Sequence, residues 1–192
     1  LGADPDSRFL KGLPSPEELL EYVIVVLGDV DPSRLSDQHI QALDTLARQT
    51  GGGLVFHAGP ENNPHRYVGT PLADLLPVTL SRSVVDTETR YDDPVSLLLT
   101  PAGRRSPLLR LDANSAVSET RWRSFPGVRW TAQTGPAKPA AEVLLVDPSP
   151  SKAQSGQAQP VLTRMSVGRG QVFYFGFDET WRWRSRVGER DY

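Results

Sequence analysis

Two apolar runs joined by an amphipathic segment dominate the hydrophobic pattern in the first part of the chain. Residues 22–27 (YVIVVL) are continuously apolar and β-branched, which predicts a strand buried on both faces, as in a parallel sheet. Residues 36–49 carry an apolar stripe at helical spacing, begin with the N-cap Ser36 and end at the glycines 51–53. Residues 54–56 (LVF) then predict a second buried strand. This order predicts a βαβ unit, whose strands run parallel through a right-handed crossover.

The pattern changes after a short helix predicted at residues 70–76, which follows an earlier short helix predicted at 16–20. Strands are predicted at 78–80, 95–99, 107–111, 128–132, 142–146, 161–166 and 171–177. Few helical patterns separate them, so residues 81–135 are expected to form an antiparallel or loop-rich excursion. The predicted fold class is α/β, with a mostly parallel sheet flanked by helices and an antiparallel, loop-rich extension.

Composition removes several classes of function. The 192 residues contain no cysteine, which excludes a disulfide framework, a thiolate metal site and a thiol nucleophile. The net charge of −2 makes no basic field, so nucleic acid is not an expected partner. No apolar run reaches about 18 residues, so no membrane span is expected. The chain opens on Leu1 and we expect residues 1–192 to be one domain excised from a longer protein.

Four segments carry a resemblance to a known family: GGGLVFHAG (51–59), GDVDPSRLS (28–36), TPLADLLPV (70–78) and GFDETWRWR (176–184). In this order they resemble class I glutamine amidotransferase-like domains, and more closely the ThuA-like branch. The narrower likeness is to such modules within large bacterial membrane-anchored proteins. The resemblance implies a flavodoxin-like, three-layer αβα fold. It also implies a membrane anchor outside this segment, with the side of the membrane undetermined.

The chain departs from that family where catalysis is expected. Active members carry a cysteine in the turn after a strand, and the matching turn here is His57-Ala58-Gly59. The family's His-x-Glu pair is also absent, because the other histidines are His39 and His65. We therefore expect a non-catalytic binding or interaction module without a cofactor. Its expected partners are other domains of the same protein or a separate protein.

Polar residues that follow the two predicted strands are the first candidates for a site. Asp29 and Asp31 follow the first strand and His57 follows the second, so all three are expected at one sheet edge, where open α/β sheets bind ligands. His57 could bind a ligand or act as a general base; alternatively, it ties down its loop. The two carboxylates could hold a metal with His57, or form ordinary turns and caps. Because no third ligand has metal-site spacing, no metal site is predicted.

Two further groups complete the candidates. Asn62 and Asn63 could line a pocket, although Asn-rich sequences also form turns. Asp178, Glu179 and Arg182 lie in a Trp/Arg-rich segment, which either grips a partner or buries its tryptophans while its arginines pair with carboxylates. The alternative function is a hydrolase-type or metal-assisted enzyme, acting on a small, carbohydrate-like substrate through His57 and nearby carboxylates.

Overall fold

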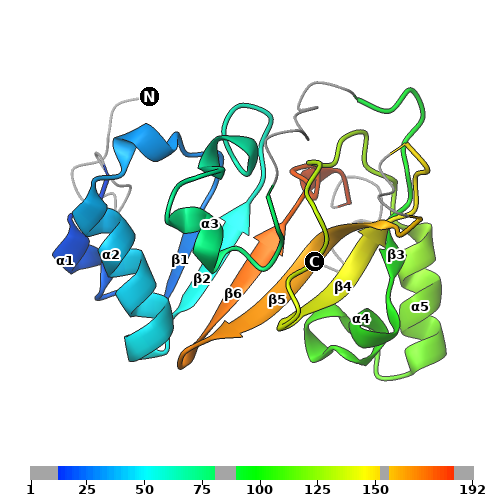
Figure 1. The fold of residues 1–192 in the computed structure, drawn as a ribbon. Helices are drawn as coiled ribbons and strands as arrows, with labels where there is room; N and C mark the ends of the chain where they lie inside the picture. Colours follow the sequence, from blue (N-terminus) through cyan, green and yellow to red (C-terminus); the bar gives the residue numbers. More distant parts are fainter. Residues whose placement is uncertain (1–12, 81–89, 152–155, 184–192) are drawn as a thin grey trace, which may run out of the picture.

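A six-stranded mixed sheet forms the centre of the protein (Figure 1), whose computed structural model describes residues 13–80, 90–151 and 156–183. In spatial order the strands are β1 (Ile24–Leu27), β2 (Gly53–His57), β6 (Gly170–Phe175), β5 (Gln159–Val167), β4 (Ala141–Asp147) and β3 (Leu98–Leu99). The strands β1, β2 and β6 run parallel, and every pairing from β6 to β3 is antiparallel. The carboxyl ends of β1, β2 and β6 therefore meet at one edge.

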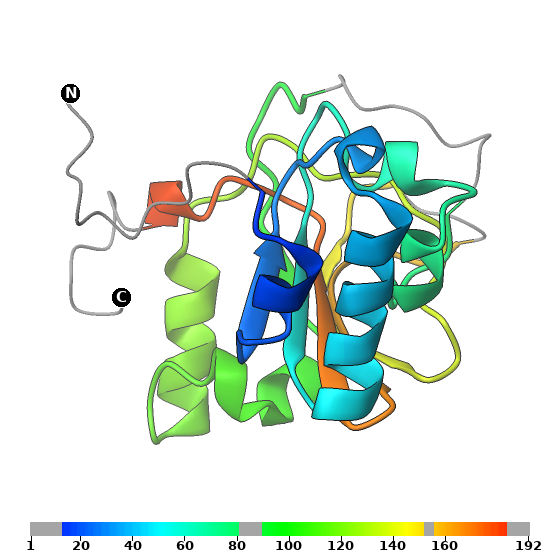
Figure 2. The ribbon, with the colours of Figure 1, turned by 90° about the vertical axis from the view of Figure 1, so that its left-hand side faces the viewer.

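Helices cover both faces of this sheet. They are α1 (Pro16–Leu19), α2 (Asp37–Thr45), α3 (Leu72–Leu75), α4 (Pro101–Arg105) and α5 (Ser115–Ser124). A π-helical turn (Leu46–Thr50) continues α2, and 3-10 turns occur at Pro32–Arg34, His65–Tyr67 and Pro107–Leu109. Figure 2 shows α2 and α3 on one side of the sheet and α4 and α5 on the other. The α/β class is confirmed.

The predicted helix between the first two strands is confirmed, and its ends show why it forms. Ser36 accepts a hydrogen bond from the His39 backbone N–H, and the His39 ring contacts the Ser36 backbone in return, as in a capping box. Gly51 stops the helical segment at φ +84°, a left-handed conformation that suits glycine. Leu43 and Leu46 of its apolar stripe are almost completely buried. The helix therefore holds β1 and β2 in the predicted βαβ unit.

Buried side chains form two clusters. The larger cluster lies under α1, α2 and α3 and includes Leu43, Leu54 and Tyr174. The smaller cluster includes Leu144 and Phe177, with Trp122 and Trp183 packed against it. The strands β5 and β6 contribute to both clusters, with Met165 and Tyr174 in the larger one and Leu162 in the smaller one.

The prediction that the first strand is buried on both faces is wrong. The side chains of Ile24 and Val26 are 59% and 62% exposed, whereas Leu27 is buried. The reason is position: β1 is the edge strand, and apolar runs look alike at the edge and at the centre of a sheet.

The middle of the chain also differs from its prediction. Residues 81–89 lie outside the described part, but α4 and α5 within residues 90–135 were not expected. A 3-10 turn replaces the strand predicted at 107–111, and within 128–132 Val128 forms an isolated bridge with Val95. Short apolar runs do not distinguish a strand from a helical turn. No helix in the described residues is long and apolar enough to cross a membrane.

Candidate binding site at the strand ends

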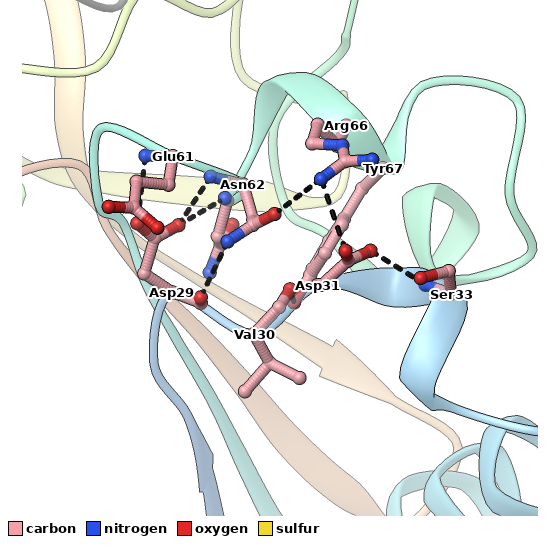
Figure 3. Close-up of polar contacts among 9 residues, drawn as sticks. Asp29, Val30, Asp31, Ser33, Glu61, Asn62, Arg66 and Tyr67 are labelled. Atoms are coloured by element: carbon pink, nitrogen blue, oxygen red, sulfur yellow. Dashed lines mark hydrogen bonds and ion pairs between the residues drawn. The ribbon is translucent and has the colours of Figure 1, made fainter.

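Asp29, which follows β1, holds the loop that follows β2. Its carboxylate accepts hydrogen bonds from the backbone N–H groups of Glu61, Asn62 and Asn63 at 2.8, 2.7 and 2.7 Å (Figure 3). The backbone approach is close at Gly59, where an added Cβ would lie 2.4 Å from the Asp29 Cβ. Both carboxylate oxygens are therefore engaged by the protein's own backbone, which is the turn-forming alternative for Asp29.

Asp31 has a capping role beside this loop. It accepts a hydrogen bond from the Ser33 backbone N–H at 3.0 Å at the start of the 3-10 turn, and it pairs with Arg66 at 3.1 Å. The hydrogen bonds from Ser33 lower the pKa of Asp31, and the positive charges of Arg66 and Arg34 act in the same direction. Arg66 also donates to Asn62 Oδ1 at 3.0 Å. Asp31 thus anchors an arginine that sequence reasoning did not single out.

Asn63 joins the ends of the first two strands. It is fully buried, and its side-chain amide donates to the carbonyl oxygens of Gly28 and His57 at 3.3 and 3.0 Å. Tyr67 adds a further tie by donating to the Val30 carbonyl at 3.0 Å, and burial raises the pKa of its phenol.

Above these ties lies a polar hollow of about 450 Å³. It is lined by Asp29, Val30, Asp31, Arg34, Glu61, Asn62 and Arg66. Asn62 borders this hollow, while Asn63 lies beneath the surface and connects the strand ends.

His57 and Asp178 lie at the neighbouring ends of β2 and β6. The imidazole of His57 stacks on Phe175 with ring centroids 6.1 Å apart. Burial raises the pKa of Asp178, and the negative charge of Glu179 adds to this, while Arg90 and His57 oppose it. Asp178 Oδ1 is buried and has no hydrogen-bond partner among the described residues. Within the same residues, no hydrogen bond joins the His57 ring to a carboxylate.

Glu179 is a structural carboxylate. It is 5% exposed, pairs with Arg90 at 3.2 Å, accepts the Arg129 backbone N–H and lies 3.8 Å from Arg182. The expectation that an arginine of this segment pairs with a carboxylate therefore holds for Arg182. Arg90 and Arg129 were missed, because they are about 90 and 50 positions away from Glu179 in the chain.

The two tryptophans of the Trp/Arg-rich segment that begins at Asp178 differ in their surroundings, and each fits one of the two predicted roles, burial or contact with a partner. Trp183 stacks on Phe125 with centroids 5.0 Å apart and donates to the Pro126 carbonyl at 2.9 Å. Trp181 is 66% exposed, and the Arg182 guanidinium lies 6.0 Å from its ring. Burial therefore explains Trp183, whereas Trp181 is accessible to a partner. Arg184 lies outside the described residues.

The candidate residues thus form two neighbouring groups. Asp29, Asp31, Asn62 and Asn63 belong to the first, and His57, Asp178, Glu179 and Arg182 belong to the second. The hydrogen bond from Asn63 to the His57 carbonyl connects them. Among the described residues, no group of three His, Asp or Glu side chains is arranged to hold a metal ion.

Comparison with known proteins identifies a fold but no family. No family model and no curated protein matches this chain. The cytoplasmic protein STM3548 from Salmonella typhimurium matches with a TM-score of 0.58 and 19% identity, over 88% of this chain and 65% of that protein. The cytoplasmic protein STM1381 from Salmonella typhimurium LT2 matches with a TM-score of 0.56 and 18% identity, over 91% and 68%. This chain therefore spans about two thirds of each neighbour, and the likeness concerns the fold alone.

Proposed function

We propose that this chain is a non-catalytic amidotransferase-like module, serving as a binding or interaction domain of a larger, membrane-associated bacterial protein. The proposal includes the flavodoxin-like three-layer arrangement of that family, with residues 81–135 as an extension. One observation carries it: at the strand ends where the family performs chemistry, the Asp29 carboxylate is occupied by three backbone N–H groups.

The turn after β2 supports the absence of catalysis. Its residues His57, Ala58 and Gly59 offer no thiol or hydroxyl nucleophile. Ala58 is 1% exposed and its N–H donates to the Phe175 carbonyl at 2.7 Å, while Gly59 packs on Asp29. A substrate at the turn 57–59 would therefore meet no nucleophilic side chain. The buried Ala58 and the packed Gly59 also leave no space for it there.

The edge strand supports the interaction role. Ile24 and Val26 of β1 are 59% and 62% exposed, and Val23 directly before the strand is 80% exposed, which is unusual for neighbouring β-branched side chains. An apolar edge strand is a surface that proteins normally cover. We propose that a neighbouring domain of the same protein covers it.

Two measurements test this proposal. Ammonia release from L-glutamine should not exceed the buffer rate, and hydrolysis that disappears in His57→Ala would refute the non-catalytic part. Hydrogen exchange at residues 23–27 should be slower in the longer protein that carries this chain than in the chain alone. Exchange at the interior strand β6 serves as the control, and equal rates at residues 23–27 in both proteins would refute the covered edge.

A second candidate is a hydrolase-type or metal-assisted enzyme acting on a small, carbohydrate-like substrate. The partly buried Asp178 near His57 favours it, because a carboxyl group with a raised pKa can act as a general acid. Hydrolysis of p-nitrophenyl glycosides by the wild-type chain, lost in both His57→Ala and Asp178→Asn, is the expected sign of this activity. Absence of hydrolysis, with and without added Mg²⁺ or Zn²⁺, counts against it.

A further inference from the structure

A second hollow lies in the other half of the sheet, away from the strand ends that hold Asp29 and His57. It has a volume of about 430 Å³ and is bounded by β4, the start of β5 and the loop 134–137. We call it the Gln159 pocket, after one of the residues that line it. The volume is within the range of pockets that hold small organic molecules.

The lining of the Gln159 pocket is apolar and uncharged. Val143, Val146, Pro136 and Pro160 contribute apolar surface, and none of the described residues that line it carries a charge. A charged ligand would lose its hydration there without an opposite charge to compensate. The lining therefore suits a neutral molecule.

One buried polar group in a residue that lines this pocket lacks a partner. The Gln159 side chain is 1% exposed, and its amide nitrogen donates to the Thr134 hydroxyl at 2.7 Å. The Thr134 hydroxyl in turn donates to the Gly135 carbonyl at 3.0 Å. Gln159 Oε1 is buried and accepts no hydrogen bond from the described residues. An unpaired buried acceptor is costly, and a ligand that donates to it removes that cost.

We propose that the Gln159 pocket binds a small, neutral, largely apolar molecule that directs one N–H or O–H donor at Gln159 Oε1, with the side chain shifting to bring this buried oxygen to the wall of the hollow. The apolar walls supply most of the affinity, because the hydrophobic contribution to binding grows with the apolar area that is buried. The amide oxygen supplies selectivity, because a molecule of the same shape without a donor leaves it unpaired. This inference does not depend on the proposed interaction role of the strand ends and β1.

Titration of the ¹⁵N-labelled 192-residue chain with indole and with benzofuran tests the proposal. The two probes have nearly the same shape, but benzofuran lacks the N–H donor. Indole should shift the amide signals of Thr134, Gly135, Ala137 and residues 157–159, and bind about fivefold more tightly than benzofuran. Equal affinities would overturn the role of Gln159, and shifts confined to other residues, or no shifts, would overturn the site.

Three variants complete the experiment. Gln159→Leu should bind both probes equally, because the acceptor is gone while the apolar walls remain. Val146→Phe should abolish binding of both, because Val146 lines the pocket and is only partly buried, so the larger ring can enter it. Gln171→Leu, at an exposed position of β6, should keep the preference for indole. If Gln159→Leu does not fold, the comparison of probes on the wild-type chain and Val146→Phe still decides.

Discussion

The polar cluster around Asp29 and the Gln159 pocket lie in different halves of one sheet, and their side-chain acceptors differ in whether the protein itself supplies a donor. At the ends of the parallel strands, both Asp29 oxygens accept backbone N–H groups within the protein. In the antiparallel half, Gln159 Oε1 is left without a donor among the described residues. At the strand ends Asp29 therefore serves the structure, although Asp178 Oδ1 after β6 also has no partner among the described residues. Location in a fold therefore does not identify a site unless the hydrogen bonds are also counted.

The largest expected effect comes from removing the carboxylate of Asp29. Asp29→Ala leaves three backbone N–H groups without their acceptor, and should lower the free energy of unfolding by about 4 kcal/mol. Urea denaturation measures this loss. Glu61→Ala is the matched control, because Glu61 contributes only its backbone N–H to the cluster, and should change stability by less than about 0.5 kcal/mol. Equal losses in the two variants would show that the cluster is not structural.

The second effect tests the antiparallel half through its aromatic contacts. Trp183→Ala removes a partly buried indole that stacks on Phe125, and should cost about 2 kcal/mol. Trp181→Ala, two positions away and 66% exposed, should cost less than about 0.5 kcal/mol. Thermal unfolding of both variants gives the comparison, and a similar loss for both would contradict the packing of Trp183 described above.

A substitution at Asp178 should raise stability, by less than the losses described above. Its raised pKa means that the folded state favours the protonated carboxyl, so stability falls as the pH rises through that pKa. Asp178→Asn, which cannot ionise, should be more stable than the wild type at pH 7. The difference should disappear below the ordinary carboxyl pKa of 3.8. Urea midpoints from pH 3 to pH 8 measure it, and a pH-independent difference would exclude ionisation as its cause.

The last expected effect is a loss of stability at high pH, which is absent at neutral pH. Burial raises the pKa of Tyr91 from 10.0 to about 12, and its hydrogen bond to Asp147 acts in the same direction. The folded state therefore retains a proton that the unfolded chain releases, and stability should fall between pH 10 and pH 12. Tyr91→Phe should reduce this slope without removing it, because burial also raises the pKa values of Tyr67 and Tyr174. An unchanged slope would show that Tyr91 does not contribute.

Those parts of the fold that depend on short stretches of sequence were predictable. The helix that begins after Ser36 and the final strand pair follow from apolar spacing, capping residues and a glycine turn. The helix α5 was not predicted, because its sequence SAVSETRWRS places no apolar stripe on one face, and Ser118 is its buried residue. Its position depends instead on contacts such as the hydrogen bond from Trp122 to the Leu109 carbonyl at 2.6 Å.

The candidate site was predictable in location but not in pairing. Asp29, Asp31 and His57 were placed at one sheet edge because each follows a predicted strand. Which groups they contact depends on loops that meet over more than thirty positions, as for Asp29 and Asn63. The Gln159 pocket had no sequence signal, because Thr134 and Gln159 are 25 positions apart and neither lies in a recognisable motif.

The place of β6 between β2 and β5 has a consequence for how the chain is made. This strand is the link between the parallel and antiparallel halves, yet it is formed by residues 170–175, more than a hundred positions after β2. During synthesis, β1 and β2 can pair early, but the other long side of β2 stays open until β6 leaves the ribosome. The two halves can therefore join only after residues 170–175 have left the ribosome, and the contact between segments distant in sequence should make folding slow.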